Sequence, residues 1–420
     1  MNLQSTSVQD RIPSLDFLRG IAVLGILLIN IESFAYPNPW SSWKYGYPTP
    51  QDHHVRFWVY FLTQGKFYTM FALLFGVGFN LFLDRAQRKV DGLRVLDLYA
   101  RRIFWLFIFG VIHAYFIWDG DILFHYAICG LLLLPFRSMK GRSIVISIFI
   151  LAAIPLFKSY ENVSSRQQSF ESYRVAVEKS EKERSSEEQR KVTNWENRYS
   201  EKMFEYTDEE APKQSYWQGV KHSLKEGQVF DGLFYYDSIL FSSLMVMLIG
   251  VLLFRSGIFS DYKVWDYYWF IAIGVLLFGL IINAYRFYHW TFLDHEPILE
   301  FWQGWIFSFP KEMLGIGYVL ILNGIYQKYL KSRKLGWLTG VGRTALSNYI
   351  FQSIVLGLLF YGYGLGWHNQ FSRIELLVPV VGIWILQILL TQIWLRYYKQ
   401  GPLEILWRIL TYGFLKKEDA

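Results

Sequence analysis

Two ionisable residues in an otherwise apolar stretch are the best candidates for chemistry. Arg102 and His113 lie in the segment RRIFWLFIFGVIHAYFIWDGDIL, which also contains Asp119 and Asp121. A charged group at the centre of a membrane-spanning helix costs about 2.5 kcal/mol or more, so such groups usually have a function. Eleven residues of helix rise about 16 Å and return to within 20° of the same face, so Arg102 and His113 share one stripe. A carboxylate from the turn would orient His113 as a general base. The alternative is a buried histidine with a purely structural hydrogen bond.

A second polar set lies in the first apolar stretch, SLDFLRGIAVLGILLINIESF. Asp16 and Arg19 are three residues apart, which favours an ion pair at one mouth of a helix. Asn30 follows Arg19 by eleven residues and therefore shares its face. The set is a candidate binding surface, and the alternative is an anchoring ion pair with an interhelical hydrogen bond from Asn30.

Two further stretches combine charges with helix-breaking or small residues. Lys66 precedes FYTMFALLFGVGF, in which Gly76 and Gly78 indicate close helix packing and not a phosphate-binding loop. Lys66 is a candidate site residue, or a lysine that extends to the membrane surface. In SFPKEMLGIGY, Pro310 stands directly before Lys311 and Glu312. This pattern predicts a broken helix beside a polar cavity, because unpaired backbone at membrane depth is tolerated only there.

The segment GVGRTALSNYIFQSIV contains three more candidates. Asn348 and Gln352 share a helix face, one turn beyond Arg343. They are candidate substrate contacts or simple interhelical hydrogen-bonding residues.

Cys129 is the only cysteine, which excludes an intrachain disulfide and a thiolate zinc site, and we expect no metal site.

The elements that position these residues are membrane-spanning helices. The chain is 53% hydrophobic and 18% charged over 420 residues, a composition typical of polytopic membrane proteins. We predict an all-α bundle of about ten transmembrane helices. Their expected ranges are 15–35, 57–83, 102–118, 121–136, 143–157, 235–255, 265–285, 301–325, 344–362 and 374–395.

Basic residues in the short loops predict the orientation. Loops near residues 85–102, 137–142 and 328–334 are rich in Lys and Arg, whereas the opposite short loops contain only Lys44, Arg56, Arg286 and Arg373. Both termini are therefore expected inside. Residues 158–231 contain 13 basic and 15 acidic residues and predict a helical extracytoplasmic insert. The expected organisation is helices 1–5 in residues 1–157, the insert in 158–232, and helices 6–10 with a cytoplasmic tail in 233–420.

Several of these motifs resemble the YeiB family of bacterial inner-membrane proteins. The resemblance rests on VGRTALSNYIFQS, HAYFIWDGDIL, LDFLRGIAVLGILLINI, KFYTMFALLFGVGF and WLRYYKQGPLEILWR, and it covers nearly the whole chain except the insert. It implies a multi-pass protein of the bacterial plasma membrane. The family has no settled biochemical function.

The first span is also distantly similar to that of the transmembrane acyltransferase superfamily, which includes heparan-alpha-glucosaminide N-acetyltransferase. Asp16, Arg19 and Gly20 match its LDxLRG pattern. That resemblance implies transfer of an acyl group from cytoplasmic acyl-CoA to a sugar on the far side. Asn30 stands where the glycan O-acyltransferases of the superfamily have a functional histidine, which leaves His113 as the candidate base.

The leading hypothesis is therefore acyl transfer across the membrane, with acyl-CoA such as acetyl-CoA as a co-substrate and no tightly bound cofactor. Arg19, Arg101, Arg102 and Arg343 are expected to bind the phosphates of coenzyme A. His113, oriented by Asp121 or Asp119, is expected to remove the acceptor's proton. Asn30, Asn348 and Gln352 are expected to position the acyl carbonyl or stabilise its oxyanion.

Two other classes of function stay open. In a proton-coupled secondary transporter, His113, Asp121, Lys66 and Glu312 would form the proton pathway. In a membrane scaffold or sensor, the buried charges would be dispensable.

The expected partners are the lipid bilayer and a surface-glycan or small-molecule acceptor. Nucleic acid is not expected, since the basic residues lie at helix ends. The oligomeric state is open, a homodimer included.

Overall fold

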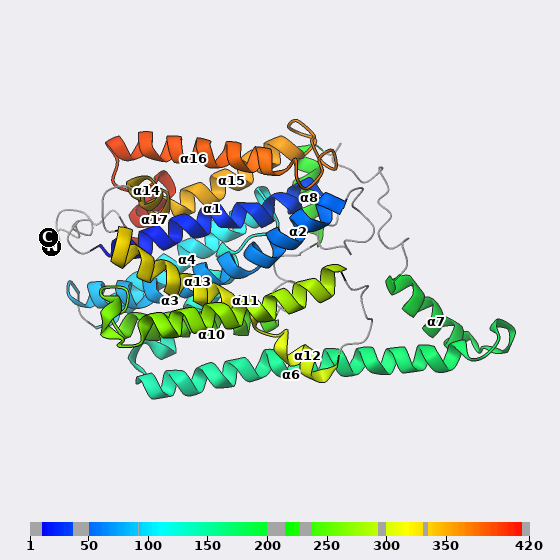
Figure 1. Cartoon of the computed structure of the whole chain (residues 1–420). Helices are drawn as coiled ribbons and strands as arrows, with labels where there is room; N and C mark the ends of the chain where they lie inside the picture. Colours follow the sequence, from blue (N-terminus) through cyan, green and yellow to red (C-terminus); the bar gives the residue numbers. More distant parts are fainter. Residues whose placement is uncertain are drawn as a thin grey trace.

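The computed structural model describes residues 11–36, 50–90, 92–199, 215–226, 237–292, 300–330 and 335–413. In these residues the regular structure is entirely helical (Figure 1). The α-helices are α1 (Pro13–Ala35), α2 (Pro50–Thr63), α3 (Lys66–Gln87), α4 (Leu93–Phe116), α5 (Leu123–Leu132), α6 (Gly141–Val177), α7 (Ser186–Tyr199), α8 (Tyr216–Glu226), α10 (Asp237–Arg255), α11 (Tyr268–Phe292), α12 (Phe301–Ile306), α13 (Pro310–Ile325), α14 (Gly336–Arg343), α15 (Ala345–Phe360), α16 (Leu377–Tyr397) and α17 (Pro402–Tyr412).

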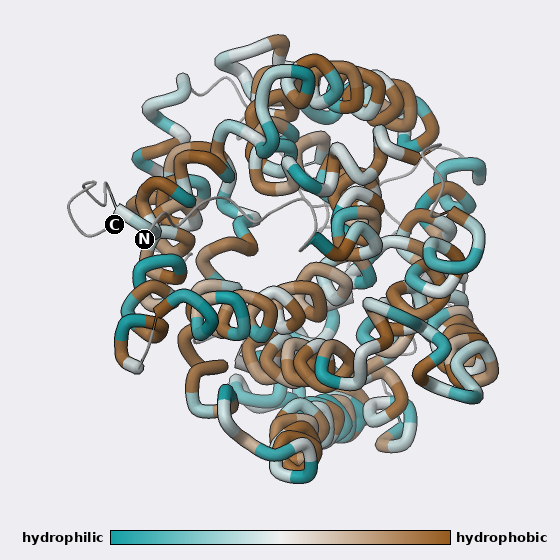
Figure 2. The backbone as a smooth tube through the Cα atoms, turned by 90° about the vertical axis from the view of Figure 1, so that its left-hand side faces the viewer, coloured by the Kyte–Doolittle hydropathy of each residue, from teal (hydrophilic) through white to brown (hydrophobic). Residues whose placement is uncertain are grey.

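The predicted helical membrane bundle is confirmed. A helix or pair of helices occupies each of the ten expected places, and six stretches of the described chain are long and apolar enough to cross a membrane. Seen along the bundle, hydrophobic segments predominate in these helices (Figure 2). The six stretches are Pro13–Ala35, Pro50–Gln87, Gly141–Val177, Tyr268–Tyr288, Phe301–Leu330 and Leu377–Tyr397.

Two expected spans are interrupted. The range 57–83 was predicted as one helix, but the chain breaks between α2 and α3, where Gly65 adopts a φ of 75°. Glycine reaches this left-handed region without the steric cost of a Cβ atom. The second break separates α12 from α13 immediately before Pro310, as the sequence predicted. Proline has no N–H and fits the first turn of a helix, so α13 begins there.

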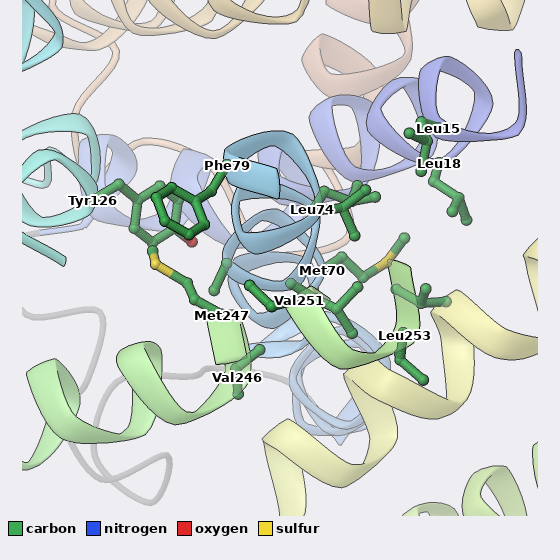
Figure 3. Packing of buried hydrophobic residues seen from close by; sticks show 14 of the residues in the cluster. Leu15, Leu18, Met70, Leu74, Phe79, Tyr126, Val246, Met247, Val251 and Leu253 are labelled. Atoms are coloured by element: carbon green, nitrogen blue, oxygen red, sulfur yellow. The ribbon is translucent and has the colours of Figure 1, made fainter. Parts of the chain in front are cut away.

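The core is centred on α3, which packs against α10, α1 and α5 (Figure 3). Backbones of α3 and α10 approach closely through two glycines that face each other's helix. A Cβ atom on Gly76 would lie 1.9 Å from the Met247 carbonyl oxygen, and one on Gly250 would lie 2.1 Å from that of Leu73. Small residues allow such contacts between membrane helices. The prediction of close packing is correct for Gly76 but wrong for Gly78, where a Cβ atom would come no closer than 4.0 Å to another element, at an Arg19 nitrogen.

Replacing Gly76 with alanine is expected to destabilise the bundle, because a backbone carbonyl of α10 must move to admit the methyl group. Overpacking of this kind costs about 1–3 kcal/mol. Gly78→Ala on the same helix has room for its methyl group and is the matched control. Thermal denaturation in detergent should give a lower melting temperature for Gly76→Ala only. Equal melting temperatures for the two variants would contradict the α3–α10 contact.

One end of the bundle brings together the start of α1, α14 and α17. A Cβ atom on Gly342 would lie 1.7 Å from the Asp16 carbonyl oxygen, and the Arg343 guanidinium donates to the Lys399 carbonyl. The start of α1 and α17 thus lie at the same end, as expected for an even number of spans. Arg85 and Arg88, which lie near the end of α3, line a cavity together with these elements, and we call this the basic end.

The insert is helical where the structure describes it. Helix α6 continues without a break past residue 157, and α7 folds back on it through the rings of Phe170, Tyr173 and Trp195. These two helices extend beyond the rest of the bundle at the end opposite the basic end (Figure 1). Helix α8 contacts α4, because the Tyr216 hydroxyl donates to the Phe116 carbonyl.

Candidate active site

His113 forms a hydrogen-bonded chain with residues from two other elements. Its Nδ1 lies 2.8 Å from an Asp121 carboxylate oxygen, and its Nε2 lies 2.9 Å from the Ser353 hydroxyl on α15. His113 is fully buried, and the Asp121 side chain is 2% exposed. The α4–α5 hairpin brings these groups together, because Gly110 lets the two helices touch. A Cβ atom there would lie 2.2 Å from the Phe124 amide nitrogen.

The partners of Asp121 determine the tautomer of the histidine ring. The second carboxylate oxygen accepts the Phe124 backbone N–H at 2.6 Å, so both oxygens of Asp121 act as acceptors. An ionised carboxylate requires a proton on His113 Nδ1. Nε2 of the neutral ring is then an acceptor and faces the hydroxyl of Ser353. This arrangement is that of a general base with an orienting partner: the histidine is the base, the aspartate orients it, and the hydroxyl occupies the position of a proton donor.

A cavity of about 480 Å³ opens at the basic end and extends into the bundle. It follows α3 from Phe71 to Ala86, which is about 22 Å of helical rise. Its inner part is lined mainly by apolar and aromatic side chains of α3, α4, α5 and α15, among them Leu74, Leu106 and Tyr126. The cavity is therefore long and largely apolar in its inner part, which suits a flexible ligand chain with little charge.

The outer part of the cavity is strongly cationic. Eight basic and only two acidic residues line it: Arg11, Arg19, Arg85, Arg88, Lys89, Arg102, Arg343 and Arg408 against Asp16 and Glu404. The Arg102 guanidinium stacks 3.6 Å from the Trp407 ring, which fixes its position. The Nε of Arg343 is buried and has no hydrogen-bond partner among the described residues. Burial lowers the pKa of Arg343, but a guanidinium stays charged at neutral pH. This mouth is suited to a multiply charged anion.

The inner end of the cavity reaches the neighbourhood of His113. Ile122 and Leu123, which directly follow Asp121, line this end together with Tyr349. The Tyr349 ring lies 5.1 Å from the His113 ring, centroid to centroid. His113 does not itself line the cavity, so one aromatic ring separates the buried imidazole from the cavity.

Several predicted site residues have the expected position. Arg19 pairs with Asp16 at 3.1 Å, and both line the cationic mouth together with Arg102 and Arg343. Arg101 does not: its side chain is about half exposed, pairs with Asp97 and lies outside the cavity. Neighbouring positions on a helix point about 100° apart, which explains why only one of the two arginines faces inward.

The choice between the two turn carboxylates is also resolved. Asp121 binds His113, whereas Asp119 is exposed on the outer side of Gly120. Asn30 is half-buried on α1 and is not among the residues that line the cavity. This position does not support the prediction that Asn30 belongs to one binding surface with Arg19.

Asn348 and Gln352 form interhelical hydrogen bonds and do not line the cavity. The Gln387 amide of α16 donates to the Asn348 side chain and backbone, and the Gln352 amide donates to Gln387 and to the Val23 carbonyl of α1. The network joins α1, α15 and α16. Their expected role at the acyl carbonyl is not supported by this position, and the alternative of interhelical hydrogen bonding describes them.

Lys66 and Glu312 lie away from the cationic mouth. Lys66 is fully buried, donates to the Tyr60 carbonyl and lies over the Phe287 ring. Glu312 is 3% exposed, lies in the first turn of α13 and lines a second cavity beside the helix break. Neither residue lines the first cavity, so their position does not support the prediction that they belong to an acyl-CoA-binding site.

Sequence reasoning missed three groups. Ser353 is 240 residues from His113 and carries no local signal. Trp407 and Arg408 of α17 belong to a tail that was expected to be cytoplasmic. Glu32 and Arg373 form a buried ion pair at the end opposite the mouth, at 3.3 Å. An acidic residue inside the first apolar stretch was the available signal for Glu32.

Lys44 and residues 331–334, which supported the predicted orientation, lie outside the described residues.

Known proteins match nearly the whole chain, and a family profile matches its C-terminal part. Residues 253–414 match the family profile described as "Protein of unknown function (DUF418)". The chain is 31% identical to "Uncharacterized protein YeiB" of Escherichia coli (strain K12), over 96% of both chains. It is 28% identical to "Uncharacterized protein YxaH" of Bacillus subtilis (strain 168), over 98% of this chain and 96% of the relative. These relatives are full-length matches without an assigned activity.

Proposed function

This chain belongs to the YeiB family, which has no settled activity, and we propose that it transfers an acyl group from an acyl-CoA donor to an acceptor at the membrane. The donor enters the cationic cavity from the basic end, and the loop charges support a cytoplasmic position for that end. The acceptor is a hydroxyl or amine of a glycan or small molecule. The distant similarity of the first span to transmembrane acyltransferases is in line with this assignment. The E. coli and Bacillus relatives favour a bacterial plasma membrane.

The observation that carries the proposal is the polarity gradient of the cavity. Eight basic residues surround its mouth, and apolar side chains line its depth as far as Tyr349. Coenzyme A has the same gradient, since its phosphates are at one end and the thioester is at the end of a flexible, weakly polar arm. The phosphates bind Arg102 and Arg343 through charge-assisted hydrogen bonds, and the arm extends toward the inner end.

The His113–Asp121 pair supplies the base. The Tyr349 ring separates His113 from the cavity, so it must first turn aside. The acceptor then takes the place of the Ser353 hydroxyl on His113 Nε2, gives up its proton to that nitrogen and attacks the thioester carbonyl carbon. The carbon–sulfur bond breaks, and coenzyme A leaves as a thiolate that receives the proton from the imidazolium. Asp121 stabilises the imidazolium between these two proton transfers.

The transport hypothesis is less well supported by the geometry. It requires His113, Asp121, Lys66 and Glu312 to act along one path, but His113 and Asp121 lie behind the inner end of the first cavity. Glu312 lines the second cavity, which shares no lining residue with the first. A cytoplasm-facing cavity with an excess of arginines is also a poor path for protons, since arginine stays protonated.

Neighbouring arginines provide a matched test of donor binding. Arg102→Gln removes a cation from the cavity and is expected to weaken acetyl-CoA binding about tenfold, the effect of one lost charge-assisted hydrogen bond. Arg101→Gln changes the next residue, which lies outside the cavity, and should leave binding unchanged. Calorimetric titration of the purified protein in nanodiscs measures both. Equal affinities for the two variants would contradict the assigned mouth.

A further inference from the structure

A second cavity, of about 390 Å³, lies beside the break between α12 and α13. Residues of α6, α10, α11, α12 and α13 line it, and none of them lines the first cavity. It lies toward the end of the bundle opposite the mouth, because it is lined by the start of α10 whereas Arg255, at the end of α10, contacts the basic loop near Arg137. Acyl transfer as proposed above does not use it.

The lining of this cavity combines an excess of cations with one carboxylate. Lys158, Arg166, Arg286 and Lys311 face a single acidic residue, Glu312. Four cations around one pocket favour an anionic group with several acceptor oxygens, and arginines in particular match the geometry of phosphate.

The carboxylate adds a second requirement. One oxygen of Glu312 lies 3.6 Å from the Lys311 ammonium, while the other, Oε2, is buried and has no hydrogen-bond partner among the described residues. A buried carboxylate oxygen without a partner carries a desolvation cost that a donor on a ligand removes. The ligand should therefore carry an anion and a hydrogen-bond donor a short distance apart.

The level of the cavity in the membrane indicates where this ligand comes from. Residues 143–157 of α6 contain no charge, and Lys158 is the first charged residue after them. Trp302 and Trp305 of α12 are exposed on either side of Gly304, a lining residue. Exposed tryptophans and the end of an apolar stretch mark the boundary between hydrocarbon and head groups. Phe149, Ile150 and Phe157 of α6 are also exposed, as lipid-facing side chains are.

We infer that this second cavity binds the head group of a membrane phospholipid that carries a hydrogen-bond donor, such as phosphatidylethanolamine. The phosphodiester lies among Lys158, Arg166 and Arg286. The ammonium donates to Glu312 Oε2. The acyl chains extend along the exposed apolar side of α6.

Native mass spectrometry of the full-length protein in detergent tests this inference with three probes: phosphatidylethanolamine, phosphatidylcholine and soluble phosphoethanolamine. Phosphatidylethanolamine should bind about tenfold more tightly than phosphatidylcholine, whose quaternary ammonium cannot donate a hydrogen bond. Phosphoethanolamine, which lacks the acyl chains, should bind more weakly than the lipid. Equal binding of both lipids by the unmodified protein would overturn the inference. Binding of phosphoethanolamine as tight as that of the lipid would assign the site to a soluble phosphate ester instead.

Two variants locate the site. Lys158→Ala/Arg166→Ala should weaken both lipids, whereas Arg142→Ala, an exposed basic residue of the same helix outside the cavity, should not. Glu312→Gln keeps the shape of the side chain and should reduce the preference for ethanolamine over choline. Unchanged lipid binding in the double variant would overturn the inference even if Glu312→Gln fails to fold.

Discussion

Replacing His113 with alanine is expected to reduce acyl transfer by about 10²- to 10⁴-fold, the contribution of a positioned general base. In the buried hydrogen-bonded chain, the His113 ring contacts both Asp121 and Ser353, so its loss breaks the chain. Binding of acetyl-CoA should persist, because His113 does not line the cavity. Release of the coenzyme A thiol, with water or an amino sugar as acceptor, measures the rate, and calorimetric titration measures binding.

His54→Ala is the matched control, since this histidine is exposed on α2. Ser353→Ala should leave more activity than His113→Ala, because the acceptor replaces the serine hydroxyl during the reaction. Thiol release that is the same in the His113→Ala and His54→Ala variants would remove the assigned base. A parallel loss of binding and rate would show instead that His113 acts through the shape of the cavity.

Removal of the Arg373 guanidinium should have the largest effect on stability. Arg373 is 2% exposed and pairs with Glu32, which also accepts the Tyr60 hydroxyl. Breaking a buried ion pair by removing one partner costs about 3–5 kcal/mol, because the other charge stays buried without its ion-pair partner. Arg373→Met should therefore lower the melting temperature in detergent strongly and reduce the yield of folded protein.

A double-mutant cycle separates the charge from the packing. Glu32→Gln/Arg373→Met removes both charges and should be less destabilised than the sum of the two single variants. Additive effects on melting would mean that the two side chains stabilise the fold independently, against the ion pair assigned here. The pair lies far from the cationic mouth, so acetyl-CoA binding by folded protein should be unchanged.

The helical bundle could be predicted because hydrophobic stretches of membrane length are a strong signal. Interruptions were predictable only where a breaker is unmistakable. Pro310 beside two charges indicated the break before α13, whereas Gly65 within a polar-flanked apolar stretch did not indicate the break before α3. A glycine is compatible with both a continuous membrane helix and a left-handed turn, and its local sequence does not decide between them.

Local geometry was also predictable at the candidate site, but distant contacts were not. The position of His113 below the turn predicted a hydrogen bond to one of its carboxylates, Asp119 or Asp121, since helical rise limits how far apart they can be. The structure has this bond to Asp121. The choice of Ser353 as the third member depends on how α15 packs against α4, which no local pattern encodes. Asn348 and Gln352 show the opposite case. Their shared face was predicted, but only the packing of α16 shows that this face binds Gln387.

The most direct test is a structure of the protein determined with a non-hydrolysable acetyl-CoA analogue at saturating concentration. The account predicts density for the phosphates beside Arg102 and Arg343, with the acyl end of the analogue against Tyr349, one ring away from His113. A cavity without density, or an analogue bound at the end of the bundle where Glu32 and Arg373 lie, would contradict it.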